Sequence, residues 1–430
     1  MEGAIGVAFE RGSYNRIRLH VLPTNRFKTF AISLFAGLPL DENSVTETAL
    51  IPFVLRRGTA STPETIAFRE RLDDLYGAGF GFDVYKRGDA QIVQFRMDVI
   101  NDRFVSSEQS LLAASLKLLG EVVTEPAMEG GSFRTKYVNA EKTTLHKKLE
   151  AIVNDKIRYA AERCLEEMCK GEPYQLHPLG RLDDVERITP ESLSAAYRGW
   201  LSRSALDLYV VGDTSLEEVQ RLVADCFKLE ADGTPSAYSK PVIKRRTGDE
   251  KTVVERMEVS QGKLNMGLRT GVGYADEQYA AALMYNGILG GYPHSKLFLN
   301  VREKQSLAYY AASRLDGHKG ICTIQSGIEI ANYEKAVAII KEQLESMRSG
   351  ELSELEMSQT RAMITNHLRE LQDSAYEMIA YDFNTVLSGQ ERTATELIRQ
   401  IGAVTPEQIA EVARGVELDT IYFLRDGKEA

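Results

Sequence analysis

The strongest constraint on the fold of this 430-residue chain is an internal repeat. The segment ITPESL at residues 188–193 returns as VTPEQI at residues 404–409. In both copies a Thr precedes a Pro at the first position of a predicted helix, and an apolar strand follows that helix. A repeat spaced this widely predicts two homologous halves instead of one continuous core.

Apolar alternation and helical periodicity divide each half into strands and helices. In the first half, alternation predicts strands at residues 17–22, 30–35, 80–86, 90–99 and 206–211. Helical periodicity covers residues 46–57, 62–75, 107–123, 133–170, 189–200 and 215–227. The second half has strands at 264–269 and around 316–318, and helices at 277–289, 295–304, 333–348 and 353–387. We therefore predict an α+β fold of two homologous halves, each an antiparallel-rich sheet with helices packed on it.

The composition changes between residues 228 and 250. This stretch is rich in Gly, Pro, Ser and charged residues and has little helical periodicity, which is typical of an interdomain linker. We therefore expect an N-terminal half at residues 1–227, a linker at 228–250 and a C-terminal half at 251–430.

An acidic composition restricts the partners of the chain. Its 62 Asp and Glu outnumber its 52 Lys and Arg, which gives a formal net charge of -10. A nucleic-acid backbone or an anionic membrane surface needs a concentrated positive face, so neither is an expected partner. No apolar run approaches the roughly 20 residues of a membrane span, and no signal-peptide pattern is visible, which predicts a cytoplasmic protein. The four cysteines show no paired spacing and indicate neither a disulfide framework nor a zinc site.

One ten-residue stretch, VREKQSLAYY at residues 301–310, carries the functional prediction. It lies where a predicted helix ends and a predicted strand begins, and such junctions often present binding side chains. Arg302 offers a planar cation for a carbonyl or carboxylate, and Tyr309 offers a phenol that can donate to an oxyanion. A turn at residues 290–293 precedes this stretch, and His294 directly after the turn is a third candidate substrate contact.

Three motifs resemble those of one enzyme family in order and in spacing. They are RRGT at residues 56–59, HPLGR at residues 177–181 and REKQSLAY at residues 302–309. Over nearly its whole length the chain is similar to the zinc peptidases of the pitrilysin, insulinase and mitochondrial processing peptidase family. The resemblance implies the processing-peptidase-like fold of that family.

The resemblance also implies where zinc would bind, and there the sequence departs from the family. Active members carry an inverted His-x-x-Glu-His motif on the helix before the Gly-Thr pair. The matching positions are Ala49, Pro52 and Phe53, none of which can ligate a metal, and Pro52 also removes a backbone donor from the helix. The third ligand of the family corresponds to Lys148, whose charge would repel a cation. We therefore predict a pseudo-peptidase with no metal or cofactor in this chain.

By the same resemblance, Arg302 and Tyr309 match the substrate-binding pair of the family. In its two-subunit branch, one chain supplies the zinc motif and the other supplies this pair across a closed chamber. The expected function is the non-catalytic, substrate-binding subunit of a heterodimeric zinc peptidase. It would bind peptide while a homologous partner subunit supplies the zinc. When purified alone, the chain could also form a homodimer, and the sequence does not decide this.

Two other functions stay open. A structural or assembly protein, similar to the core subunits of respiratory complexes, would tolerate changes at Arg302 and Tyr309. An active metallopeptidase with atypical ligands would contain stoichiometric zinc, which metal analysis would detect. His177 is expected to have a local structural role, and His146 is expected on a solvated helix face.

Overall fold

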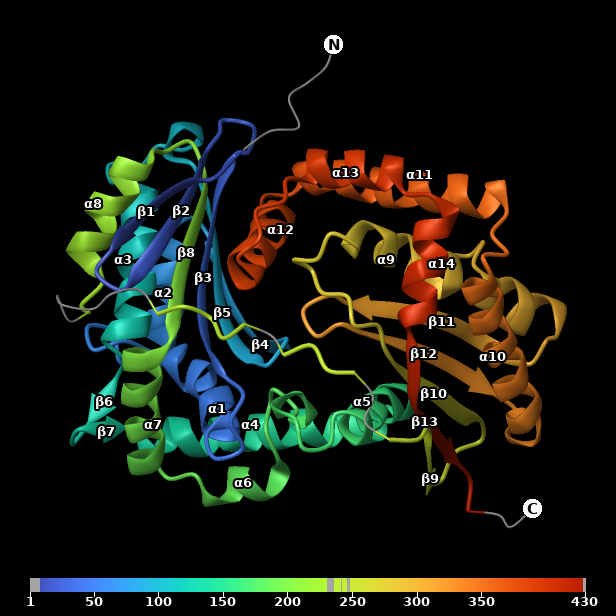
Figure 1. Cartoon of the computed structure of the whole chain (residues 1–430). Helices are drawn as coiled ribbons and strands as arrows, with labels where there is room; N and C mark the ends of the chain where they lie inside the picture. The colour runs from blue at the N-terminus through green and yellow to red at the C-terminus, as the bar shows by residue number, and fades with distance from the viewer. Residues whose placement is uncertain (1–7, 230–235, 241, 246–247, 428–430) are drawn as a thin grey trace.

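Two β-sheets with helices packed on their outer sides stand opposite each other (Figure 1). The computed structural model of the protein describes residues 8–229, 236–240, 242–245 and 248–427. Each sheet belongs to one of the two repeated parts of the sequence.

The first sheet has six strands in the order β1-β2-β8-β3-β5-β4. Strands β2 and β8 run parallel, whereas β3 is antiparallel to both of its neighbours, β8 and β5. A separate two-stranded sheet is formed by β6 and β7. The bounds are β1 Glu10–Tyr14, β2 Ile17–Pro23, β3 Thr29–Pro39, β4 Gly79–Arg87, β5 Ala90–Ile100, β6 Met128–Glu129, β7 Ser132–Phe133 and β8 Ala205–Gly212.

The second sheet repeats this topology. Its five strands follow the order β9-β13-β10-β12-β11, in which β13 is parallel to β9 and antiparallel to β10, as β8 is to β2 and β3. The bounds are β9 Lys251–Arg256, β10 Gly262–Arg269, β11 Ala308–Asp316, β12 Ile321–Ile328 and β13 Glu417–Arg425. The same strand order in both sheets confirms the predicted α+β fold of two homologous halves.

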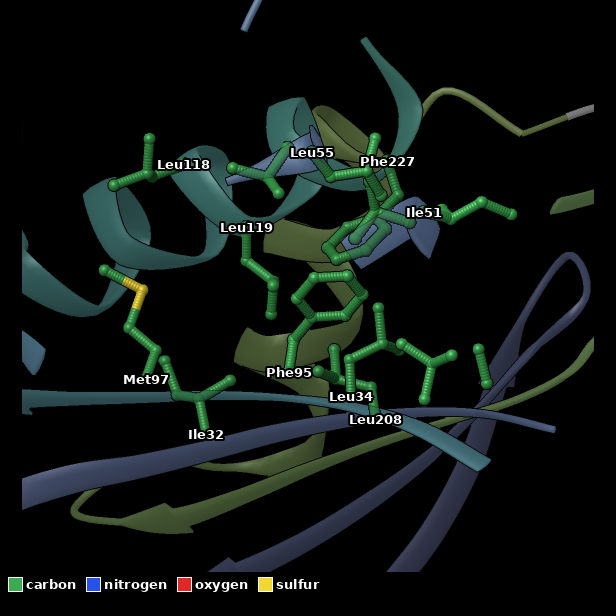
Figure 2. Packing of buried hydrophobic residues seen from close by; sticks show 14 of the residues in the cluster. Ile32, Leu34, Ile51, Leu55, Phe95, Met97, Leu118, Leu119, Leu208 and Phe227 are labelled. Atoms are coloured by element: carbon green, nitrogen blue, oxygen red, sulfur yellow. The ribbon is translucent and has the colours of Figure 1, made fainter. Parts of the chain in front are cut away.

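The first core lies between the first sheet and the helices on its outer side. Leu34 and Phe95 of the sheet point toward Ile51 and Leu55 of α1 and Leu119 of α3 (Figure 2). The helices are α1 Val45–Leu55, α2 Thr65–Asp74, α3 Leu111–Thr124, α4 Thr135–Asn154, α5 Lys156–Met168, α6 Leu182–Arg187, α7 Pro190–Arg203 and α8 Leu216–Cys226, with 3-10 turns η1 Asp102–Phe104 and η2 Pro173–Gln175.

The second core is built in the same way from the second sheet and its helices. Two π-helical segments, η3 Gly287–Gly291 and η4 Phe298–Lys304, lie between α9 and β11. The other elements are α9 Tyr279–Asn286, η5 Ile330–Asn332, α10 Tyr333–Ser349, α11 Glu354–Glu370, η6 Leu371–Asp373, α12 Ala375–Ser388, α13 Ala394–Ala403 and α14 Pro406–Gly415.

The two halves exchange one helix each. Helix α5 comes from the first half but packs on β10 and β13 of the second sheet, and α12 comes from the second half but packs on β3 and β8 of the first sheet (Figure 1). Phe383 of α12 stacks on Phe35 of β3 with ring centroids 3.9 Å apart. The halves are therefore joined by apolar cores and not only by a covalent linker.

A buried ionic cluster also joins the halves. The Lys319 side chain is fully buried, with Nζ 2.7 Å from Asp89 Oδ1 and 3.0 Å from Glu172 Oε2. Glu172 also accepts from Arg269 at 2.7 Å, and Arg269 lies 3.1 Å from Asp419. A buried cation with two carboxylate partners avoids the cost of an unpaired charge.

Both long predicted helices are in fact two helices. The segment 133–170 breaks at Asp155, whose side chain accepts the backbone N–H groups of Ile157 and Arg158 and starts α5. The segment 353–387 breaks at η6, and Ser374 accepts the N–H of Glu377 to start α12. Each break allows a helix to cross to the opposite sheet.

Smaller corrections concern element boundaries. Helix α2 begins at Thr65 and not at the predicted residue 62, because Glu64 is its N-cap. Strand β9 and helix α13 were not predicted. Of the expected linker at 228–250, Gly233 and Pro235 lie outside the described residues. Tyr238, within them, donates a 2.8 Å hydrogen bond to Asp207 and packs against Phe383.

Two further observations concern the cysteines and the membrane. All four cysteines are buried and unpaired. Among the helices of the described ranges, none is long and apolar enough to span a membrane.

Candidate functional site

The positions that match the zinc motif lie inside the first core. Ala49 is fully buried, Phe53 is 2% exposed, and Pro52 is also buried. Helix α1 continues past Pro52 to Leu55, so the proline does not end the helix. Apolar atoms therefore occupy the face on which an active member would carry its ligands.

Phe53 and Lys148 meet in space, as the resemblance implied. The Lys148 ammonium lies 5.9 Å from the centre of the Phe53 ring, and that ring packs edge-to-face on Phe82 of β4 at 4.7 Å. The Arg56 guanidinium lies 5.3 Å from the centre of the Phe82 ring. Two cations on an aromatic pair repel a metal ion and offer it no ligand.

The two glutamates of α4 near Lys148 each interact with another side chain of the protein. Glu141, seven residues before Lys148 on α4, is fully buried and accepts from Arg57 Nε at 2.6 Å. Glu150 is exposed and lies 3.5 Å from His146. Among the residues that the structure describes, no group of three or more His, Cys, Asp or Glu could hold a metal ion.

Arg302 is presented on the surface by the π-helical segment η4. Its side chain is 42% exposed, and its guanidinium lies 4.6 Å from the ring of Phe298, one turn earlier. The carboxylate of the adjacent Glu303 lies 3.5 Å away. Stacking on the ring fixes the guanidinium plane while leaving donors available for an incoming carbonyl or carboxylate.

Tyr309 lies on β11, which is an edge strand of the second sheet. Its ring is 51% exposed and its hydroxyl donates to Glu329. This hydrogen bond raises the pKa of the phenol, so the group stays protonated, and its single O–H is donated to Glu329. Because η4 packs against β11, Arg302 and Tyr309 are presented at the same edge of the sheet.

The backbone between these two residues is bent. Ser306 has a φ of 50°, in the left-handed region, where the chain leaves η4 and enters β11. Gly290 lies close to this strand, because a Cβ at Gly290 would approach the backbone nitrogen of Ser313 to 2.5 Å. The predicted turn at 290–293 therefore begins as the π-helical end of α9 and packs tightly against β11.

His294 is engaged by the protein itself. Its Nε2 lies 2.8 Å from the hydroxyl of Thr360, and its ring stacks on Tyr292 at 5.6 Å. Burial lowers its pKa. His294 therefore anchors the turn before η4, and a substrate contact by this residue stays a prediction.

His177 and His146 lie as expected from the sequence, the first in a structural role and the second on a helix surface. His177 Nδ1 accepts the backbone N–H of Leu179 at 3.1 Å, and burial lowers its pKa to about 4. His146 faces solvent beside Glu150 on α4.

Sequence reasoning missed a cavity of about 470 Å³ between the halves. Its lining residues come from strands of the first sheet and from helices of the second half, so no local motif marks it. Neither Arg302, Tyr309 nor His294 lines this cavity, but Tyr292, which stacks on His294, does.

The fold and the site define the class: a peptidase-like protein of two repeated halves whose described residues lack the metal apparatus. A family model described as "Peptidase M16 inactive domain" matches residues 187–364. The chain is 40% identical over 419 residues to the "Probable inactive metalloprotease YmfF" of Bacillus subtilis, covering 96% of this chain and 97% of that protein.

Two other comparisons agree. The "Uncharacterized zinc protease YmxG" of the same bacterium is 23% identical over 283 residues, which cover 62% of this chain and 67% of that protein. The crystal structure of a conserved protein from Enterococcus faecalis is 33% identical, with a TM-score of 0.89 over 98% of this chain and 99% of that chain. The chain belongs to the M16 peptidase family, and the resemblance found in the sequence is confirmed.

Proposed function

We propose that this chain is the non-catalytic, substrate-binding subunit of a heterodimeric zinc peptidase. Arg302 and Tyr309 bind the peptide, and a homologous M16 chain that carries the zinc ligands cleaves it. One contrast supports the proposal: Phe53 and Lys148, which match zinc ligands by resemblance, cannot bind a metal, whereas Arg302 and Tyr309 are exposed near a sheet edge.

The chemistry of the two exposed side chains supports a role in peptide binding. The guanidinium of Arg302 can fork onto a backbone carbonyl or a terminal carboxylate of an extended peptide. The phenol of Tyr309 can donate to an oxygen that becomes more negative during cleavage when its O–H turns from Glu329 to that oxygen. Neither contact requires a metal ion in the same chain.

The relatives support a division of labour between two chains. Bacillus subtilis contains both a relative named as an inactive metalloprotease and a relative named as a zinc protease. A protein of the first kind needs a protein of the second kind in order to take part in hydrolysis. We therefore infer that the partner of this chain is a homologue that retains the zinc motif.

Peptide binding by the purified chain tests the first part of this proposal. An unstructured fluorescent peptide library titrated with the wild-type chain should show saturable anisotropy. Arg302→Ala should weaken binding by about 2 to 5 kcal/mol, which is at least about 25-fold in Kd. Lys304→Ala is the matched control, because Lys304 is an exposed cation of the same segment and should have little effect.

Two results would count against the proposal. Equal losses in the Arg302 and Lys304 variants would show that general positive charge, and not a specific guanidinium contact, attracts the peptide. Unchanged binding in both Arg302→Ala and Tyr309→Phe would favour a structural or assembly role instead.

A further inference from the structure

The cavity between the two halves has the composition of a binding pocket. Its volume is about 470 Å³, within the usual range for small-molecule sites. Strands β3, β4 and β5 form one wall, and helices α9, α11 and α12 form the other. The lining includes seven aromatic rings, which are Phe35, Tyr85, Tyr274, Tyr279, Tyr292, Tyr381 and Phe383.

Two phenols in this wall have unused hydrogen-bonding capacity. Tyr274 is 4% exposed, and the hydroxyls of Tyr274 and Tyr381 are buried without a hydrogen bond of normal geometry to the protein. They lie close enough for each to affect the pKa of the other, and burial raises both pKa values. Both phenols are therefore protonated near neutral pH. The hydroxyl of Thr385 also interacts with Tyr274, so these three hydroxyls share weak contacts that a ligand oxygen can replace.

Neighbouring residues hold the aromatic wall in place. The buried Arg392 guanidinium lies 5.4 Å from the Tyr274 ring and 5.2 Å from the Tyr279 ring. The His318 ring stacks on the Tyr274 ring, with the ring centroids 5.5 Å apart. Gly287 makes room for Tyr292, because a Cβ at Gly287 would lie 3.0 Å from that ring. The pocket is therefore largely preformed and needs little ordering on binding.

The pocket is accessible and adjoins the candidate peptide site. Glu377, Ala380 and His367 line it and are exposed, so it reaches solvent. Tyr292 lines it and stacks on His294, in the turn that leads to η4 and Arg302. A peptide bound along the edge strand β11 would therefore lie next to the turn that contains Tyr292, and this turn borders the pocket.

We propose that this pocket binds an aromatic amino-acid side chain together with an acceptor oxygen of its amide or hydroxyl group. Rings of the wall pack on the ligand ring, and the phenols of Tyr274 and Tyr381 donate to the acceptor oxygen. The claim that a peptide carries this aromatic side chain into the pocket rests on the proposed function. The claim that the pocket binds an isolated aromatic amino-acid derivative does not depend on the proposed function.

A pair of substitutions of the same type tests the pocket directly. Ala380 is exposed on α12 and lines the cavity, so Ala380→Leu adds volume inside the pocket without disturbing buried contacts. Ala362→Leu is the control, because Ala362 is exposed on α11 and does not line the cavity. Binding of N-acetyl-tyrosinamide and N-acetyl-leucinamide would be measured by calorimetry or ligand-observed NMR.

The wild type and Ala362→Leu should bind the tyrosine derivative more tightly than the leucine derivative, and Ala380→Leu should lose at least about tenfold in affinity for the tyrosine derivative. Tyr381→Phe should weaken binding while leaving the aromatic preference. No binding by the folded wild type, or equal binding by Ala380→Leu, would overturn the inference.

The result is separable from the proposed function. Arg302→Ala should bind N-acetyl-tyrosinamide normally, because Arg302 does not line the pocket. N-acetyl-tyrosinamide can bind while aromatic peptides bind no better than aliphatic peptides. In that case the pocket binds a free aromatic molecule, and the claim that its ligand is part of a peptide is wrong.

Discussion

The replacement of Phe53 by Ala tests whether the former metal position is now part of the folded core. Phe53 is 2% exposed, belongs to the first core and packs on Phe82 at 4.7 Å, with the Lys148 ammonium over its ring. Truncation of a buried Phe costs about 3 to 5 kcal/mol in unfolding free energy, because apolar burial is lost and a cavity remains. This loss is a large fraction of the stability of a typical domain.

The chain carries its own probe for this measurement. Trp200 is the single tryptophan, is 1% exposed and lies in the same core as Phe53. Its fluorescence during urea unfolding therefore reports on the first half. The control is Phe104→Ala, because Phe104 is 44% exposed and its truncation should cost less than about 1 kcal/mol.

An open, functional metal pocket would give a different result. Side chains at such a site are accessible to water and substrate. Phe53→Ala would then lower the unfolding free energy as little as Phe104→Ala does. A cost below about 1 kcal/mol, within the range of surface substitutions, would refute the claim that the core has absorbed this position.

Four further predictions follow from the ionic cluster, from His177 and from the positions matched to the zinc ligands. Lys319→Met should cost about 3 to 5 kcal/mol in unfolding free energy, because it leaves buried carboxylates without their cation, whereas the exposed Lys335→Met should be nearly neutral in the same urea experiment. Burial alone would raise the pKa of Glu172, but hydrogen bonds from Arg269 and Lys319 lower it, so its stabilising effect should be present above about pH 4.5 and lost below it. Burial lowers the pKa of His177 from 6.5 to about 4, so the unfolded state takes up the proton first and stability should fall from pH 6.5 toward pH 4; His177→Asn should reduce this slope in urea midpoints measured across that range. Metal analysis of the purified chain after incubation with zinc and gel filtration should find less than stoichiometric zinc, and a one-to-one content would revive an active metallopeptidase.

Much of the fold follows from local patterns in the sequence. The Thr-Pro helix starts at Thr189 and Thr405 are capping boxes in the structure, and they mark equivalent positions in the two halves. Counting back from Gly58 matched Phe53 to the zinc motif, and in the structure the Lys148 ammonium lies 5.9 Å from the centre of its ring. Such features depend only on neighbours in the chain, which is why the sequence predicts them.

What the sequence did not predict depends on contacts between distant segments. Periodicity continues through Asp155 and Ser374, and only the side-chain caps and the opposite sheet explain why α5 and α12 begin there. The cavity was missed for the same reason, since Tyr85 and Tyr274 are far apart in the chain. His294 was predicted to face substrate, but its bond to Thr360 is visible only once α11 is placed beside the turn.

A hydrolysis assay with two chains tests the central claim most directly. The purified chain would be mixed with the homologue from the same organism that retains the His-x-x-Glu-His motif, and cleavage of a quenched fluorescent peptide would be followed. We predict no hydrolysis by this chain alone with added zinc, hydrolysis by the mixture, and a loss of at least about 25-fold in kcat/KM with Arg302→Ala but not with Lys304→Ala. Equal rates for the homologue alone and for the mixture, or an unchanged rate with Arg302→Ala, would contradict the account.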